Sequence, residues 1–221
     1  MTDATANTHK AARKSSGAQQ MLLAFASLIV LLIFFSVSSP NFLQTSNILA
    51  ILQATSVNGV LALAATLVII TGGIDLSVGT LMTFCAVMAG VVLTFWGLPL
   101  PFGILAAVGT GAFAGLISGT LVAKMKIPPF IATLGMMLIL KGLSLVISGT
   151  KPIYFNDTPS YPQISTGSLI GTVFPSVPVP NGVLILFVLA LIIGWVLTKT
   201  VLGRYCYALG SNEEAVRLSG V

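Results

Sequence analysis

Asp75 is the one acidic side chain between Asp3 and Asp157, and it interrupts a long apolar stretch. An ionisable group in such surroundings is costly to bury, so a functional role is the default hypothesis. The carboxylate would contact a solute or a coupled ion directly. Alternatively, Gly72 and Gly73 break a helix, because glycine tolerates positive φ, and Asp75 caps the helix that follows. The two roles are compatible where a broken helix lines a watery cavity.

Four uncharged hydrogen-bonding side chains precede this segment: Gln53, Thr55, Ser56 and Asn58. They suit a neutral, hydroxyl-rich solute, because each can donate or accept without a buried charge. They equally suit hydrogen bonds between membrane helices. The candidates for lining a solute path are therefore Gln53, Thr55, Ser56, Asn58, Gly72, Gly73, Asp75 and Ser77.

The segment from Gly203 to Val221 is dense in charge, with Arg204, Glu213, Glu214 and Arg217. Ser211 and Glu214 have the spacing of a capping box, and Glu213 precedes Arg217 in the favourable i,i+4 order. This pattern predicts a short helix over residues 212–219. Because so short a helix is unstable alone in water, it needs either the membrane surface or a soluble partner to rest on.

Composition sets the class of protein. Hydrophobic residues make up 56% of the chain and charged residues 7%, far below the roughly 25% charged residues of soluble domains. Continuous apolar runs favour helices over a barrel. We therefore predict an all-α, polytopic transmembrane helical bundle. The net charge of +5 is attributed to lysines and arginines at the ends of spans, which set orientation, and no nucleic-acid partner is expected.

The predicted bundle has about six spans, one of which is interrupted at the Gly-Gly-x-Asp break. The spans are residues 21–38, 48–71, 75–96, 102–123, 128–148 and 181–198. Basic residues cluster before the first span, after the fourth and after the sixth: Lys10, Arg13 and Lys14, then Lys124 and Lys126, then Lys199, Arg204 and Arg217. The positive-inside rule places these clusters, and with them the N-terminus, in the cytoplasm.

Residues 1–20 are polar and are expected to form a disordered cytoplasmic tail, with the membrane domain at 21–221. A lone His9 does not make a metal site. Residues 21–35 also resemble the apolar core of a signal peptide, but the long polar lead and the five later spans favour an uncleaved first helix.

The loop from Gly149 to Pro180 carries six prolines, so no regular helix or central strand is expected to run through it. Its apolar stretch, Ser168 to Phe174, is too short to span a membrane. The loop is interpreted either as a structured cap on the outer side or as a docking surface or gate.

No catalytic or metal-binding group stands out. The chain lacks the G-x-x-x-x-G-K-[ST] phosphate loop of ATP-hydrolysing proteins, and it has no cluster of His, Cys or carboxylate residues. A membrane-embedded enzyme is therefore disfavoured. An ion-coupled secondary transporter of a neutral solute stays as an alternative, although one acidic residue makes a thin ion relay.

Three ordered motifs carry a family resemblance. They are Gly72-Gly-Ile-Asp-Leu-Ser-Val-Gly79, Ile127-Pro-Pro-Phe-Ile-Ala-Thr-Leu134 and Leu202-Gly-Arg-Tyr-Cys-Tyr-Ala-Leu-Gly-Ser-Asn-Glu-Glu-Ala-Val-Arg-Leu-Ser-Gly220. The chain resembles, from about Pro40 onward, the permease subunit of ribose-type ABC importers, which handle monosaccharides such as ribose, xylose and galactose.

The resemblance implies inward sugar transport by alternating access across the bacterial inner membrane. It implies four partners: a cytoplasmic ABC ATPase that binds ATP and Mg, a periplasmic sugar-binding protein, a second permease copy in a homodimer, and membrane lipid. No cofactor is then expected in this chain. The implied ATPase-coupling residues are Arg204, Tyr205, Gly210, Ser211, Asn212, Glu213, Glu214 and Arg217. Family permeases continue with several more helices beyond the position of Val221, so we expect the sequence to be incomplete.

Overall fold

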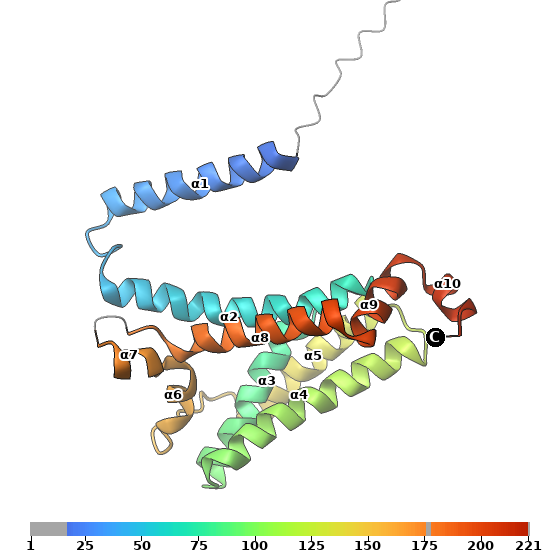
Figure 1. Ribbon diagram of the computed structural model, residues 1–221. Coiled ribbons are helices and arrows are strands. Elements are labelled where there is room, and N and C mark those ends of the chain that lie inside the picture. The colour runs from blue at the N-terminus through green and yellow to red at the C-terminus, as the bar shows by residue number, and fades with distance from the viewer. Residues whose placement is uncertain (1–16, 176–177, 221) are drawn as a thin grey trace, which may run out of the picture. The chain divides into compact units, whose positions relative to one another are not determined.

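The computed structural model describes residues 17–175 and 178–220, in which all regular structure is helical. The helices are α1 (Gly17–Ser38), α2 (Thr45–Ile70), α3 (Val78–Gly90), the π-helical turn η1 (Val91–Phe95), α4 (Leu100–Ala123), α5 (Pro129–Ile147), α6 (Ser160–Thr166), α7 (Leu169–Val173), α8 (Asn181–Lys199), α9 (Val201–Ser211) and α10 (Glu213–Leu218) (Figure 1).

Six helical segments are long and apolar enough to cross a membrane, and they confirm the six predicted spans to within a few residues. They are Gln19–Ser38, Thr45–Ile70, Val78–Phe95, Leu100–Ala123, Pro129–Ile147 and Asn181–Lys199. Because α1 begins at Gly17, residues 17–20 are helical, although the sequence placed them in the tail. The rest of the predicted tail, with His9 and the first basic cluster, lies outside the described residues.

The chain divides into two compact units, Met1–Ile48 and Leu49–Val221. In the first unit, α1 leads into a turn where the rings of Phe35 and Phe42 stack with centroids 5.7 Å apart. The side-chain amide of Asn47 donates to the Phe42 carbonyl oxygen at 2.8 Å and closes this turn.

The core of the second unit lies where α3, α4 and α5 pack together (Figure 1). Phe84 of α3, Ala114 of α4, and Met136 and Leu140 of α5 form its buried cluster. Beyond the cluster, Leu93 of η1 is only 2% exposed. It packs so closely on Gly103 of α4 that a methyl group at Gly103 would collide with it.

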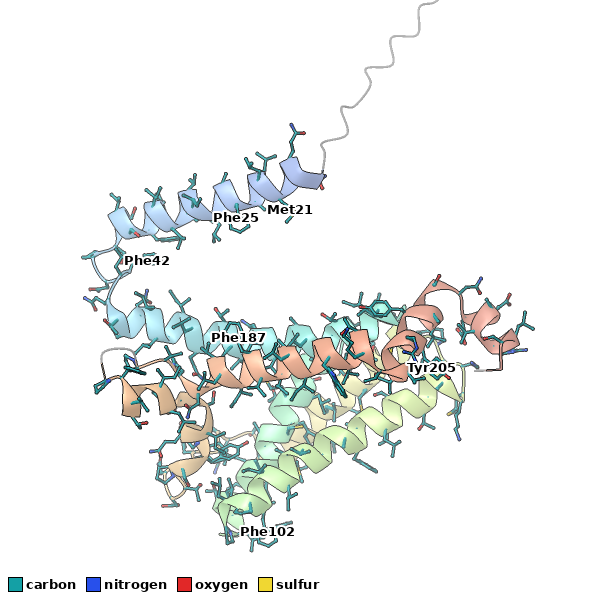
Figure 2. All side chains as sticks on the ribbon, viewed as in Figure 1. Met21, Phe25, Phe42, Phe102, Phe187 and Tyr205 are labelled. Atoms are coloured by element: carbon teal, nitrogen blue, oxygen red, sulfur yellow. The ribbon has the colours of Figure 1, made fainter. Side chains whose placement is uncertain are left out.

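Helix α8 packs along α2. A Cβ at Gly59 of α2 would lie 2.7 Å from a methyl group of Leu186, and one at Gly182 of α8 would lie 2.6 Å from Ser56 Oγ. Large apolar side chains point away from this packed interior, among them Phe102 and Phe187 (Figure 2), which are 53% and 64% exposed. Hydrocarbon, rather than water, suits such a surface.

The proline-rich loop contains two short helices, α6 and α7, and, as predicted, no single helix runs through its described residues. Helix α6 tolerates Pro162 because that proline stands in the first turn, where the amide lacks a helical partner. Helix α7 begins after Ser168, whose hydroxyl accepts the Gly171 amide at 2.8 Å. The ring of Phe155 packs on Tyr161 with centroids 4.7 Å apart, and α6 contacts α8. The described part of the loop is therefore a structured segment.

Candidate functional site

The break between α2 and α3 is a glycine-dependent helix end. Gly72 has φ of +81°, a value that glycine adopts freely and other residues rarely do. The Gly72 amide donates to the Ile69 carbonyl oxygen and the Gly73 amide to that of Val68, both at 3.0 Å. This is the Schellman pattern of a helix C-terminus. A break is present at Gly72 and Gly73, but it lies between two spans, α2 and α3, and not within one span as predicted.

The Asp75 carboxylate binds the turn that leads into α3. Its Oδ1 accepts the backbone amide of Ser77 at 2.7 Å and the Ser77 hydroxyl at 2.6 Å. Helix α3 begins at Val78, so its N-cap residue is Ser77. Asp75, which the sequence suggested as the cap, lies two residues before that position. Oδ2 accepts no hydrogen bond from the described residues, which leaves direct contact with a solute open.

A third residue, Thr133 of α5, holds the break from the side. Its buried hydroxyl accepts the Leu76 amide at 3.2 Å and lies 3.1 Å from the Ile74 carbonyl oxygen. The same hydroxyl lies 2.8 Å from the Pro129 carbonyl oxygen, so its one hydrogen serves either carbonyl in turn. Sequence reasoning missed Thr133 as a site residue. The available signal was a lone hydroxyl in the first turns of an apolar span.

The end of α9 lies against the end of α2. Gly210 fits directly on the Ile70 carbonyl group, so closely that a Cβ there would overlap the oxygen. Gly210, predicted to act in coupling, therefore contacts the helix that carries the break. Arg204 and Tyr205 lie earlier on α9 and are exposed (Tyr205 in Figure 2).

The cap of α10 is Asn212, so the predicted Ser211–Glu214 capping box was wrong. Asn212 has extended backbone angles, φ −161° and ψ 101°, and its side chain accepts the Ala215 amide at 3.0 Å. Ser211 is instead the last residue of α9. Asn212 thus ends one helix and begins the next, and asparagine caps as well as serine does.

Glu213 pairs with Lys126 rather than with Arg217. Lys126 Nζ lies 3.1 Å from Glu213 Oε1, and no ion pair between Glu213 and Arg217 forms among the described residues. Lys126 belongs to the connection between α4 and α5. The i,i+4 pairing predicted from the sequence is therefore replaced by a contact between segments far apart in the chain.

These segments enclose a cavity of about 720 Å³. We call the surrounding structure, residues 71–77, 126–133 and 209–213, the junction. The cavity is bordered by Gly72, Gly73 and Asp75 from the break, by Lys126 and Thr133, by Gly115 and Gly119 of α4, and by Leu209 and Glu213. No group of three or more His, Cys, Asp or Glu side chains within residues 17–175 and 178–220 is placed to hold a metal ion.

The polar residues of span two lie elsewhere. Gln53 is seventeen residues from the end of α2, which at 1.5 Å per residue is about 25 Å from the junction. Its Nε2 donates to Ser165 Oγ of α6, and the Ser56 hydroxyl donates to the Gln53 carbonyl oxygen at 2.8 Å. Thr55 and Asn58 are exposed on the other side of α2. The predicted path residues therefore fall into separate groups.

Gln53 makes the kind of contact that the helix-packing alternative predicted, because it joins α2 to α6. Ser56 bonds within α2 and lies against Gly182 of α8. Gln53 Oε1 is buried without a hydrogen-bond partner among the described residues. A buried amide oxygen usually has a partner, so this oxygen is an exception to the usual pattern.

The chain matches a known protein family. A family model described as "branched-chain amino acid transport system / permease component" matches residues 47–221. The chain belongs to this family. The matched residues of this permease family include the whole junction, α6, α7 and α8, and leave out α1.

Several similar proteins are permeases named for sugars. The ribose import permease protein RbsC of Escherichia coli K12 is 39% identical over 198 residues, which are 88% of this chain and 59% of the relative. The RbsC protein of Bacillus subtilis strain 168 is 39% identical over 93% of this chain and 62% of the relative. The galactofuranose transporter permease protein YtfT of E. coli K12 is 38% identical over 88% of this chain and 57% of the relative.

The chain thus spans about three fifths of the length of the curated relatives that it matches. No solved structure matches it significantly. Together, the six apolar helices and the permease relatives identify a multi-pass membrane protein.

Proposed function

We propose that this chain forms part of the permease subunit of an ABC importer that moves a monosaccharide inward across the bacterial inner membrane by alternating access. The observation that carries the proposal is the match of residues 47–221 to the permease family, with relatives named as ribose and galactofuranose permeases. The junction supports it, because the exposed segment α9–α10 contacts the break between two spans.

The proposed driving partner is a separate cytoplasmic ATPase subunit, which binds ATP and Mg. Helix α10 offers it an exposed surface, on which Glu214 and Arg217 are exposed and Leu218 is 88% exposed. A sugar-binding protein on the opposite face, a second permease copy and surrounding lipid complete the proposed assembly.

The proposed solute is a neutral sugar, with ribose as the first choice because two RbsC proteins are 39% identical to the chain. The family description names branched-chain amino acids, and these are the second candidate. An amino acid carries two charges that need buried partners, whereas the polar groups of α2 are uncharged. The import permease relatives also argue against an ion-coupled secondary transporter.

The test is uptake by the complete system, with the permease, its ATPase and its binding protein in one membrane. We expect labelled ribose, but not leucine, to accumulate, and uptake to stop when ATP is depleted. Uptake that persists without ATP and collapses with the ion gradient would overturn the importer. Accumulation of leucine in place of sugar would overturn the substrate class alone.

Binding of the ATPase is tested by copurification. The permease with residues 203–221 is expected to retain the ATPase subunit through washing, and a variant that lacks them is expected to lose it. Equal retention of the ATPase would show that α9 and α10 do not provide the docking surface. Equal recovery of both permease forms from the membrane is the control for insertion.

A further inference from the structure

Lys126 has a backbone conformation that its side chain disfavours. Its φ is +57°, in the left-handed region that glycine occupies freely and residues with a Cβ occupy at a cost. Hydrogen bonds on either side, from the Met125 amide to the Thr120 carbonyl oxygen at 3.3 Å and from the Ile127 amide to that of Leu121 at 3.2 Å, hold this turn. A glycine would adopt this conformation at a lower cost, which indicates that the lysine side chain itself has a role.

Among the described residues, the Lys126 side chain has one partner, Glu213, at the start of α10. The two side chains are 68% and 66% exposed, and exposed ion pairs contribute little to folding stability. Stability therefore does not explain the pair. What the pair does provide is a direct connection between α10 and the segment that leads into α5.

That segment is stiff, and it ends on the helix break. Pro128 and Pro129 follow Lys126 closely, and a proline ring fixes φ. Pro129 opens α5, and Thr133, one turn later, binds Ile74 and Leu76 on both sides of Asp75. A displacement of Lys126 along this route reaches the break without passing through a flexible loop.

We propose that Lys126 and Thr133 are positioning residues of a link that carries movement of α10 to the break between α2 and α3. The inference rests on the proposed function, because an ATPase has to move α10. The link acts through Glu213, the two prolines and the Thr133 hydroxyl. It works in parallel with the direct contact of Gly210 on Ile70.

The experiment uses the complete importer in vesicles and measures ATP hydrolysed per ribose taken up. Lys126→Glu and Glu213→Lys each place like charges together and are expected to raise this ratio about two- to fivefold, the effect of an exposed ion pair. The double variant restores opposite charges and is expected to return the ratio to its original value. Lys124→Glu makes the same charge change in the same connection, where no ion pair forms among the described residues, and should leave the ratio unchanged.

Two further variants separate charge from backbone strain and test the other end of the link. Lys126→Gly relieves the strained φ and removes the pair, and it is expected to raise the ratio although the backbone is relaxed. Thr133→Val removes the hydroxyl at similar volume and should raise the ratio, whereas Thr133→Ser keeps the hydroxyl and should not. Amounts of permease in the membrane are measured for every variant.

The outcomes separate the two proposals. If the unaltered complex shows no ATP-dependent uptake, the proposed function is overturned and the link with it. If uptake is ATP-dependent and the ratio stays unchanged in Lys126→Glu, Lys126→Gly and Thr133→Val, the link alone is overturned. A double variant no better than the single variants also overturns the role of the Lys126–Glu213 pair.

Discussion

One oxygen of Asp75 holds the turn before α3, since it accepts both the amide and the hydroxyl of Ser77. The role of this residue depends on whether the molecule needs the oxygen or the charge. An asparagine supplies the same oxygen without the charge, and an alanine supplies neither. The two substitutions therefore distinguish a structural carboxylate from one that meets the solute.

We expect Asp75→Asn to keep thermal stability and sugar uptake close to those of the unaltered protein. Asp75→Ala is expected to lose about 1 kcal/mol of stability, as for other cap-type hydrogen bonds. Melting temperature in detergent and uptake in vesicles are the measurements. Abolished uptake in Asp75→Asn, with normal insertion and melting temperature, would show that the charge itself contacts the solute.

At the scale of elements, one glycine and one capping residue determine the positions of α9 and α10. Gly210 permits α9 to rest on the end of α2, and Asn212 turns the chain into α10. Both features act on backbone positions, so single substitutions at them move whole helices. For each of these two positions, another residue of the same or similar type in the chain serves as a control.

Gly210→Ala is expected to destabilise the protein by about 2 kcal/mol, because the added methyl group meets a backbone carbonyl that cannot rotate away. Gly194→Ala in α8 is the control: nothing lies within 4 Å of its added Cβ. There alanine should stabilise the helix by up to about 1 kcal/mol. Thermal unfolding of both variants is the measurement, and equal shifts would show that the close contact is absent in the membrane.

Asn212→Ala is expected to loosen α10 by about 1 kcal/mol, and hence to speed amide exchange at Ala215 about fivefold. Ser211→Ala should leave that exchange unchanged, because Ala215 binds Asn212. Hydrogen exchange read by mass spectrometry over residues 213–218 distinguishes the two. Faster exchange in Ser211→Ala alone would restore the capping box that the sequence suggested.

At the scale of the whole molecule, three connections that are distant in sequence meet at one end of the second unit. They are the break, the turn with Lys126, and the passage from α9 to α10, all of which border one cavity. The positive-inside rule predicts that this end faces the cytoplasm, because its basic residues follow the fourth and sixth spans. It also predicts that the loop that holds Lys151 faces outward.

This orientation predicts which cysteines a membrane-impermeant thiol reagent can reach in intact spheroplasts. In a Cys206→Ser background, Lys151→Cys should be labelled from outside, and Lys126→Cys only after the membrane is opened. Cys85 lies within α3, and its labelling in the background variant is the blank. Labelling of Lys126→Cys from outside in intact cells would reverse the orientation.

The sequence predicted the spans well because their apolar length is a local property, and it predicted the break because Gly72 needs only its own backbone freedom. It failed where the partner is distant. Thr133 meets residues 57 and 59 positions away, and Lys126 meets one 87 positions away. Ser211 and Asn212 are both residue types that cap helices well. Because α9 continues through Ser211, the N-cap position of α10 falls to Asn212.

Gly115 and Gly119 border the junction cavity with nothing within 4 Å of where a side chain would begin. Because both residues are glycines, they leave the cavity wide on its α4 side. Alanine, valine and leucine at these two positions would narrow it in graded steps without altering a hydrogen-bonding group. If the transported solute passes through this cavity, such substitutions on α4 are expected to exclude larger solutes before smaller ones, and uptake of a size series of sugars would measure the limit.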